Sequence, residues 1–332
     1  MTEDRKNDHI DLAFSSQADH LLADPRFTYE PLLGSSENGK IEPFRFLGKT
    51  LRTPMWVSSM TGGSTFARII NTNLAMACRE FGMGMGLGSC RILLEDTKYY
   101  PDFDVRHIMG DDLPLYANIG IAQLEQMTGD KSTDRILEIV SRLKADGLII
   151  HVNPIQEWLQ TEGDILVRPP LETIEEFLML TRLSIIVKEV GQGMGPESIS
   201  RLMKLPIDAF EMAAYGGTNF AKVELARTSE QKRELFAPVS MVGHTAGEML
   251  EMINQAALAN DEIKCRQIII SGGIRSFLDG YYYISKSILP AIYGQASAFL
   301  RHACGDYEDL RQFVSGQITG LIFARAFLKV KK

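Results

Sequence analysis

The 332-residue chain has few cysteines, no long apolar run and no excess of positive charge. Its four cysteines show no CxxC spacing, which argues against a zinc site or a redox pair and favours reduced thiols. The formal net charge is −7, whereas nucleic-acid binding needs a basic face, so we expect no nucleic-acid partner. No stretch reaches the ~18 apolar residues of a membrane span, and the polar start MTEDRKNDHI is unlike a secretory signal. We therefore expect no membrane association and a cytoplasmic location.

From residue 54 onward, short apolar runs alternate with longer segments of helical spacing. The runs are nearly continuous in apolar character, as in parallel sheets that are covered on both faces. Eight such units predict a (β/α)₈ TIM barrel over residues 51–332, an architecture whose single domain can reach ~250 residues or more. A doubly wound open sheet is the alternative. The predicted strands are 54–59, 83–88, 114–119, 147–152, 184–190, 207–213, 266–271 and 290–296, and the predicted helices include 64–81, 130–145, 171–182, 244–259 and 306–328.

Residues 1–50 form an N-terminal extension that is polar and without a strong period. Such a leader is often a disordered arm. Against that interpretation, several apolar side chains in it are suited to packing on the barrel. These are Leu21, Leu22, Phe27, Leu32, Leu33, Phe44 and Phe46.

Polar or glycine residues follow each predicted strand. Barrel enzymes carry their chemistry at the C-terminal ends of the strands, so these tails predict one ring of functional groups around one mouth. The tails are 58–63, 88–91, 118–120, 151–153, 188–189, 216–218, 271–273 and 294–297.

The segment SGGIR at 271–275 follows an apolar strand and precedes a helical stretch. Its glycines let backbone N–H groups approach an anion, and phosphate sites after the seventh and eighth strands recur in barrels. The seventh and eighth tails here are 271–275 and 294–297. A simple tight turn at Gly272 and Gly273 is the alternative, but the position in the barrel favours phosphate binding.

Lys188 lies in the apolar run IIVKEV, where a buried lysine is costly unless it meets an anion. A salt bridge with Glu189 or a surface-edge lysine would explain it without a ligand. The functional hypothesis is a cation beside N1 of a flavin, where positive charge stabilises the anionic reduced ring. Asn118 and Thr218 would then hydrogen-bond to the ring edge or the ribityl chain.

Two further segments are candidates for substrate and metal binding. In HVNPIQEWLQTEGD at 151–164, Glu157 can ligate Mg²⁺ and the uncharged Gln156 can orient a group without competing for the metal. This segment could also be a polar loop that caps the next helix. In RKNDH at 5–9, a basic cluster could clamp a phosphate, although a solvated tail is the simpler interpretation.

Taken together, these segments resemble the type 2 isopentenyl-diphosphate isomerases, which are FMN-dependent barrels. The resemblance covers most of the chain, with the motifs in the same order. The matching pieces are RKNDHI (5–10), SSMTGG (58–63), GLGSCR (86–91), NIG (118–120), HVNPIQE (151–157), VKEVGQGM (187–194), GGTNF (216–220) and SGGIR (271–275).

The resemblance implies a 1,3-proton shift that interconverts isopentenyl and dimethylallyl diphosphate. Reduced FMN would act as an acid–base group at N5, NADPH would keep it reduced, and Mg²⁺ would join the substrate diphosphate to Glu157. It also implies a homo-oligomer, a tetramer or an octamer. The substrate residues would be Arg5, Lys6, His9, Asn153 and Gln156, with Gln156 beside the reacting carbons; the FMN contacts would be Met60, Thr61, Gly62, Ser89, Asn118, Lys188, Thr218, Gly273, Ile274, Arg275, Ala296 and Ser297.

Three segments depart from the family pattern. Ala213 stands where members carry a serine, and VGHT at 242–245 replaces a WGxxT motif. The eighth-strand region at 286–300 lacks the family's LGA and GMxRPFL motifs. The changed eighth-strand region keeps open a flavin-binding barrel without turnover. A second alternative is an FMN oxidoreductase of the 2-hydroxy-acid or dihydroorotate type, which needs a base to remove a proton as hydride leaves, and we find no histidine pattern for such a base.

Overall fold

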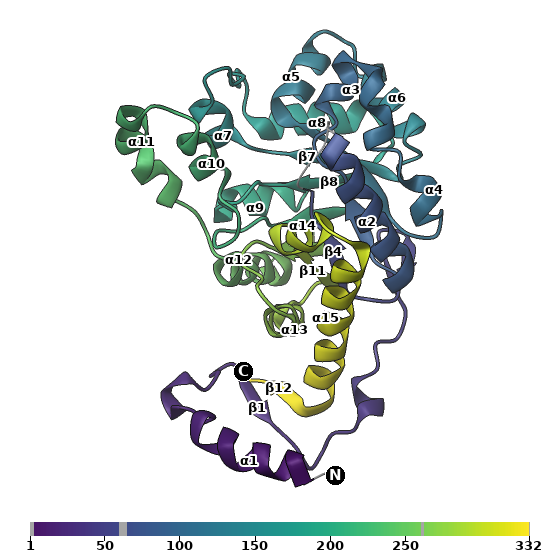
Figure 1. Ribbon diagram of the computed structural model, residues 1–332. Coiled ribbons are helices and arrows are strands. Elements are labelled where there is room, and N and C mark those ends of the chain that lie inside the picture. The colour runs from purple at the N-terminus through teal and green to yellow at the C-terminus, as the bar shows by residue number, and fades with distance from the viewer. Residues whose placement is uncertain (1–2, 60–64, 260–261, 332) are drawn as a thin grey trace.

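A computed structural model describes residues 3–59, 65–259 and 262–331. Eight parallel strands close into a barrel in which neighbours in sequence are neighbours in space, and β11 returns to β4 (Figure 1). The closed order confirms the predicted barrel and excludes the open sheet. The strands are β4 (Met55–Val57), β5 (Gly84–Gly86), β6 (Leu115–Gly120), β7 (Gly147–His151), β8 (Ser184–Lys188), β9 (Ala209–Glu211), β10 (Ile268–Ser271) and β11 (Ala291–Gln295).

The strands are buried on both faces, which accounts for their continuous apolar character. On β10, Ile268, Ile269 and Ile270 are all fully buried, although successive side chains point to opposite faces. The glycine-rich β5 is also part of the barrel. A Cβ on Gly84 would lie 2.5 Å from the Trp56 ring of the neighbouring strand, so that ring occupies the space of a side chain.

Helices surround the barrel, and each of the five predicted helices is present. They are α2 (Thr65–Phe81), α6 (Asp134–Arg142), α8 (Pro170–Leu180), α12 (Ala246–Ala259) and α15 (Tyr307–Phe327). The other helices are α3 (Arg91–Glu95), α4 (Arg106–Met109), α5 (Ile121–Gly129), α7 (Pro154–Leu159), α9 (Pro196–Leu202), α10 (Phe220–Ala226), α11 (Glu230–Phe236), α13 (Phe277–Lys286) and α14 (Ser297–Ala303), with 3₁₀ turns η1 (His20–Leu22), η2 (Ser36–Gly39), η3 (Thr97–Asp102) and η4 (Ala237–Met241).

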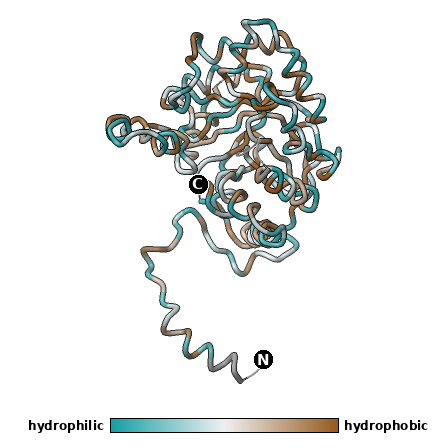
Figure 2. The backbone as a smooth tube through the Cα atoms, turned by 45° about the horizontal axis from the view of Figure 1, so that its top comes forward, coloured by the Kyte–Doolittle hydropathy of each residue, from teal (hydrophilic) through white to brown (hydrophobic). Residues whose placement is uncertain are grey.

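The N-terminal extension leads along the outside of the barrel rather than folding over it. Its first helix, α1 (Glu3–Ser15), stands apart from the body in both views (Figures 1 and 2). Farther along, β1 (Phe27–Tyr29) pairs with the C-terminal β12 (Leu328–Val330), and the hairpin β2 (Phe44–Phe46) and β3 (Lys49–Leu51) joins the arm to the barrel. The extension is therefore anchored from β1 onward and projects before it.

The expectation that seven apolar residues of the extension pack on the barrel is only partly right. Phe46 is buried in the core, Phe27 is buried against the rings of Tyr281 and Tyr282 on α13, and Phe44 packs partly against the core. The other four are exposed because they lie in η1 and in the turn after β1, which the barrel does not cover. These four are Leu21, Leu22, Leu32 and Leu33.

None of the helices formed by the described residues combines the length and hydropathy that a membrane crossing requires.

Candidate functional site

A cavity opens at the C-terminal ends of β4, β8, β9, β10 and β11. Its empty volume, counted out to the open solvent at the mouth, is about 560 Å³. The predicted ring of strand tails is therefore confirmed for this side of the mouth. The cavity is lined by Ser58, Ser59, Lys188, Val190, Gly191, Glu211, Ala213, Ala214, Gly217, Thr218, Phe220, Ser271, Gly272, Gly273, Ile274, Gly294, Gln295, Ala296, Ser297 and Ala298.

Two glycine loops form one wall of the cavity by packing backbone against backbone. Gly272 has a φ of +88°, and a Cβ on it would lie 2.1 Å from the carbonyl oxygen of Ala214. No other residue type fits there without a shift of the main chain. The wall therefore presents backbone atoms in place of side chains, as an anion-binding loop requires.

Lys188 borders this cavity and is 6% exposed. Its Nζ donates a hydrogen bond to the backbone carbonyl of Glu189 at 2.7 Å. The Glu189 carboxylate does not contact the ammonium and instead accepts hydrogen bonds from the N–H groups of residues 191–193 at 2.6–3.0 Å. Burial raises the pKa of this carboxyl group. The salt bridge considered as an alternative does not form, and no described carboxylate lies within ion-pair distance of the ammonium.

Three buried polar atoms on the cavity wall have no hydrogen-bond partner in the described part of the chain. They are Ser59 Oγ, Glu211 Oε2 and Gln295 Oε1. Leaving such groups unpaired costs about 1–3 kcal/mol each, so they rarely gather in one place without a ligand. The cavity is built for a polar molecule.

Six of the residues expected at FMN line this cavity: Lys188, Thr218, Gly273, Ile274, Ala296 and Ser297. Three do not line it. Ser89 and Arg275 are exposed, and the amide of buried Asn118 is engaged by Leu87 O and by His151 Nδ1. The remaining three, Met60, Thr61 and Gly62, lie outside the described residues.

A second polar cluster lies on α7 and α10. Asn153 Nδ2 donates to Glu157 Oε1 at 2.8 Å and to Gln156 Oε1 at 3.2 Å, and Gln156 Nε2 donates to Glu224 Oε1 at 3.1 Å. The other Glu157 oxygen accepts the backbone N–H of Asp164 at 3.0 Å. Asn153, Gln156 and Glu157, which the sequence grouped by proximity, are thus in one hydrogen-bonded network.

Two members of these networks were given no individual role from the sequence, although His151 lies in the predicted tail at 151–153. Glu224 follows the GGTNF motif at the fourth residue, and its 4% exposure makes it a buried carboxylate on a short helix. His151 ends β7 beside Lys188 of β8. Burial of its ring, with a smaller contribution from the Lys188 ammonium, lowers the pKa of His151 to about 3. A polar residue inside an apolar segment was the available signal in both cases.

The helix α1, which carries the N-terminal basic cluster, does not line the cavity. None of the residues that line the cavity comes from α1, and His9 is exposed. The side chains of Arg5 and Lys6 lie outside the described part of the structure. Among the described residues, no group of three or more histidine, cysteine, aspartate or glutamate side chains is arranged to hold a metal ion.

Comparison with solved structures supports the fold. A mandelate oxidase mutant with a monooxide FMN adduct matches with a TM-score of 0.56 at 14% identity, covering 92% of this chain and 88% of that one. A mutant flavocytochrome b2 with benzoylformate matches with a TM-score of 0.62 at 13% identity, covering 91% and 75%. At this identity the likeness concerns the barrel alone.

Sequence comparison is more specific. No family model matches the chain. The isopentenyl-diphosphate delta-isomerase of Rickettsia peacockii is 33% identical over 305 residues, which cover 90% of this chain and 86% of the relative. The protein of the same name from Nostoc sp. (strain PCC 7120) is 32% identical over 333 residues, covering 97% and 91%. With the type 2 motifs in order on a closed barrel, these matches show that the chain is an isomerase of the isopentenyl-diphosphate delta-isomerase family.

Proposed function

We propose that this protein interconverts isopentenyl and dimethylallyl diphosphate by a 1,3-allylic proton shift that uses reduced FMN, Mg²⁺ and NADPH as reductant. The observation that carries the proposal is the full-length match to isomerases of that name, on a barrel whose mouth holds unpaired polar groups. The proposed role of each residue follows from the family motifs and, where the structure describes the residue, from the contacts given above.

The residues of the cavity fit FMN. The glycine loops at 216–217 and 272–273, with Ser297, suit its phosphate, and the uncompensated Lys188 ammonium suits N1 of a reduced ring. Bound reduced FMN would supply the proton donor and acceptor at N5, and NADPH would bring it to that state before turnover. The remaining proposed contacts to FMN are Thr218, Ile274, Ala296, Ser89, Asn118, Arg275 and the segment 60–62.

The α7 network fits the substrate. Gln156 is held from both sides, by Asn153 and by Glu224, which would fix its amide beside the reacting carbons. Glu157 is a buried carboxylate, and Mg²⁺ commonly takes one or two carboxylates and completes its shell with phosphate oxygens and water. Arg5, Lys6, His9 and Asn153 would hold the diphosphate.

The reaction has two physical requirements that such a site can meet. Protonating an alkene creates cationic character, which an electron-rich ring and excluded water protect. Binding energy from the diphosphate, remote from the reacting carbons, can hold the alkene in position for proton transfer.

The test begins with the purified protein, which we expect to be yellow and to release FMN on denaturation. With NADPH and Mg²⁺ it should interconvert the two C5 diphosphates without net loss of NADPH. Loss of NADPH in proportion to product would favour the FMN oxidoreductase. Bound FMN with neither reaction would favour a flavin-binding barrel without turnover.

A further inference from the structure

Glu211 is a fully buried carboxyl group inside the barrel mouth, at the end of β9. Ser58 Oγ donates to its Oε1 at 2.5 Å, and Ser271 Oγ donates to the same oxygen at 3.2 Å. The other oxygen, Oε2, has no partner among the described residues, and Glu211 lines the cavity. One half of the carboxyl group is therefore fixed by the protein, and the other half is left for a ligand.

The strand register places Glu211 between the two ends of the cavity. It pairs with Lys188 on β8, and with Ile269 on β10 two residues before the Ser271–Gly273 turn. In the proposed orientation of FMN, the ring lies beside Lys188 and the phosphate lies at the 271–273 loop. The part of FMN between ring and phosphate is the ribityl chain, which carries hydroxyl donors.

The neighbouring backbone fixes the Glu211 side chain further. Ser271 Oγ accepts the N–H of Ala213 at 3.0 Å while it donates to Glu211, so the chain of hydrogen bonds runs Ala213, Ser271, Glu211. Ala213 has a φ of +42°, lines the cavity and offers it no hydroxyl group. In this chain the polar partner on β9 is Glu211.

We propose that Glu211 Oε2 accepts a hydrogen bond from a ribityl hydroxyl group of FMN, so that Glu211 is a cofactor-binding residue of this site. The proposal rests on the proposed FMN cofactor. It assigns the ribityl chain, as distinct from the ring or the phosphate, to the centre of the barrel mouth.

The experiment compares three ligands that share the isoalloxazine ring: lumiflavin, which lacks the ribityl chain, riboflavin and FMN. Their dissociation constants are measured by fluorescence titration of protein freed of flavin, for the wild type, E211L and E211Q. Tyr293→Phe is the matched control, since it removes another buried, unpartnered group inside the barrel that does not line the cavity. Thermal unfolding of each protein without ligand shows that it is folded.

We expect E211L to raise the dissociation constants of riboflavin and FMN by about tenfold each, which corresponds to one lost hydrogen bond. The dissociation constant of lumiflavin should not change. E211Q should weaken the binding of the same two ligands by less, because an amide in this position keeps one hydrogen bond to the hydroxyl group. Tyr293→Phe should bind all three ligands as the wild type does.

Two results with a folded protein would overturn the assignment: equal weakening of lumiflavin, which would place the contact on the ring, or no weakening of any ligand by either Glu211 variant. If E211L does not fold, E211Q decides the question by the same comparison. Failure of the wild type to bind FMN at all is a different outcome, and it would remove the proposed cofactor itself.

Discussion

At the scale of single residues, the barrel mouth is defined by polar groups held at a cost. The Lys188 ammonium, the neutral His151 ring and the half-paired Glu211 carboxyl lie on three consecutive strands. Burying each of them costs desolvation free energy, even though Lys188 donates to Glu189 O and His151 is hydrogen-bonded to Asn118. Their presence together is what a binding site requires, and it has consequences for stability that can be measured.

The lowered pKa of His151 predicts a pH-dependent loss of stability. Between the unfolded value near 6.5 and the folded value of about 3, only the unfolded chain binds the proton. Stability from this residue is present above pH 6.5 and falls as the pH falls, by up to about 1.4 kcal/mol per pH unit. We therefore expect the free energy of unfolding, measured by urea titration from pH 7 to pH 4, to fall less steeply with falling pH in His151→Gln than in the wild type. Identical slopes would contradict the assigned shift.

The proposed metal role of Glu157 predicts a specific loss of activity. Glu157→Gln should lower isomerisation by on the order of a hundredfold and raise the Mg²⁺ concentration for half-maximal rate, because an amide is a poor ligand for a hard cation. Bound flavin, followed by absorbance, should not change. Glu162→Gln, an exposed residue of the same segment, is the matched control and should behave as the wild type. Unchanged turnover in Glu157→Gln would remove it from the metal site.

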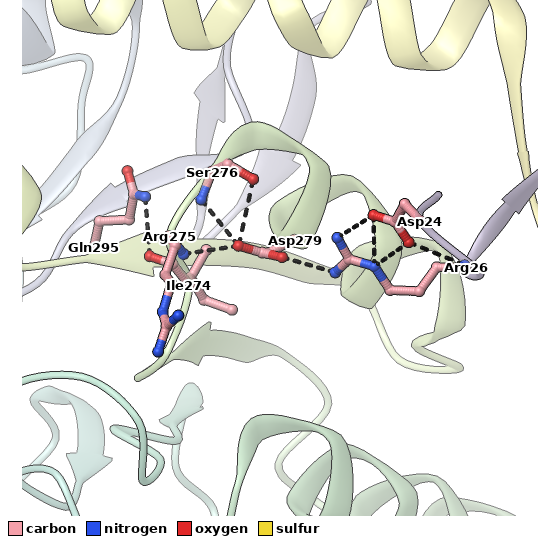
Figure 3. A network of polar contacts seen from close by, with 7 residues as sticks. All are labelled: Asp24, Arg26, Ile274, Arg275, Ser276, Asp279 and Gln295. Atoms are coloured by element: carbon pink, nitrogen blue, oxygen red, sulfur yellow. Dashed lines mark hydrogen bonds and ion pairs between the residues drawn. The ribbon is translucent and has the colours of Figure 1, made fainter. Parts of the chain in front are cut away.

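At the scale of elements, the helix that follows the glycine loop is tied to the N-terminal extension by one carboxylate (Figure 3). Asp279 Oδ2 accepts the N–H groups of Arg275 and Ser276 at 2.9 and 3.0 Å, completing a capping box with Ser276 at the start of α13. Asp279 Oδ1 pairs with Arg26 at 2.7 Å. The same network includes Gln295, whose Nε2 donates to Ile274 O, so it reaches the cavity wall.

Removing this carboxylate should loosen the element without unfolding the barrel. We expect Asp279→Ala to lower the free energy of unfolding by about 1–2 kcal/mol, through the lost helix cap and the half-buried ion pair. Asp24→Ala is the control, because it removes the other partner of Arg26 but no helix cap. It should lower the free energy of unfolding by less than about 1 kcal/mol. Denaturant titration of both variants gives the comparison. Equal losses would show that the cap contributes nothing beyond the ion pair.

At the scale of the whole molecule, the extension is a projecting arm with an apolar surface. Leu21 and Leu22 are 77% and 82% exposed, Leu32 is 93% exposed, and α1 before them stands clear of the barrel (Figure 2). Exposed leucines in one segment favour contact with another protein surface, and in a closed assembly that surface is a second copy. No residue of α1 lines the cavity of its own chain, so we expect the same contact to bring the helix that carries Arg5, Lys6 and His9 towards the cavity of a neighbouring copy.

The arm therefore predicts the assembly. We expect the full chain to be a homo-oligomer, a tetramer or an octamer, by analytical ultracentrifugation. A variant that lacks residues 1–22 keeps Arg26 and β1, and should sediment as a smaller species with unchanged thermal stability of the barrel. If the truncated variant keeps the same number of chains per particle as the full chain, other surfaces hold the copies together.

The architecture could be predicted because its causes are local. A strand buried on both faces must be continuously apolar, as in β10, and a helix on the outside must show a period of 3.6, as in α2 and α12. Even the glycine-rich β5 was recognisable from its place in the alternation. The leucines of the arm could not be predicted in the same way, because an apolar residue in a sequence does not specify whether its partner belongs to the same chain.

The sequence by itself determined the barrel and the family, since these depend on pattern and on motifs that are contiguous in the chain. Only the tertiary structure decided which polar atoms are satisfied. Glu189 turns to three neighbouring N–H groups instead of to Lys188, and Glu211 takes its donor from Ser58, 153 residues away. Barrel closure brings such partners together from distant strands, so the charge left unpaired at the mouth is a property of the folded chain.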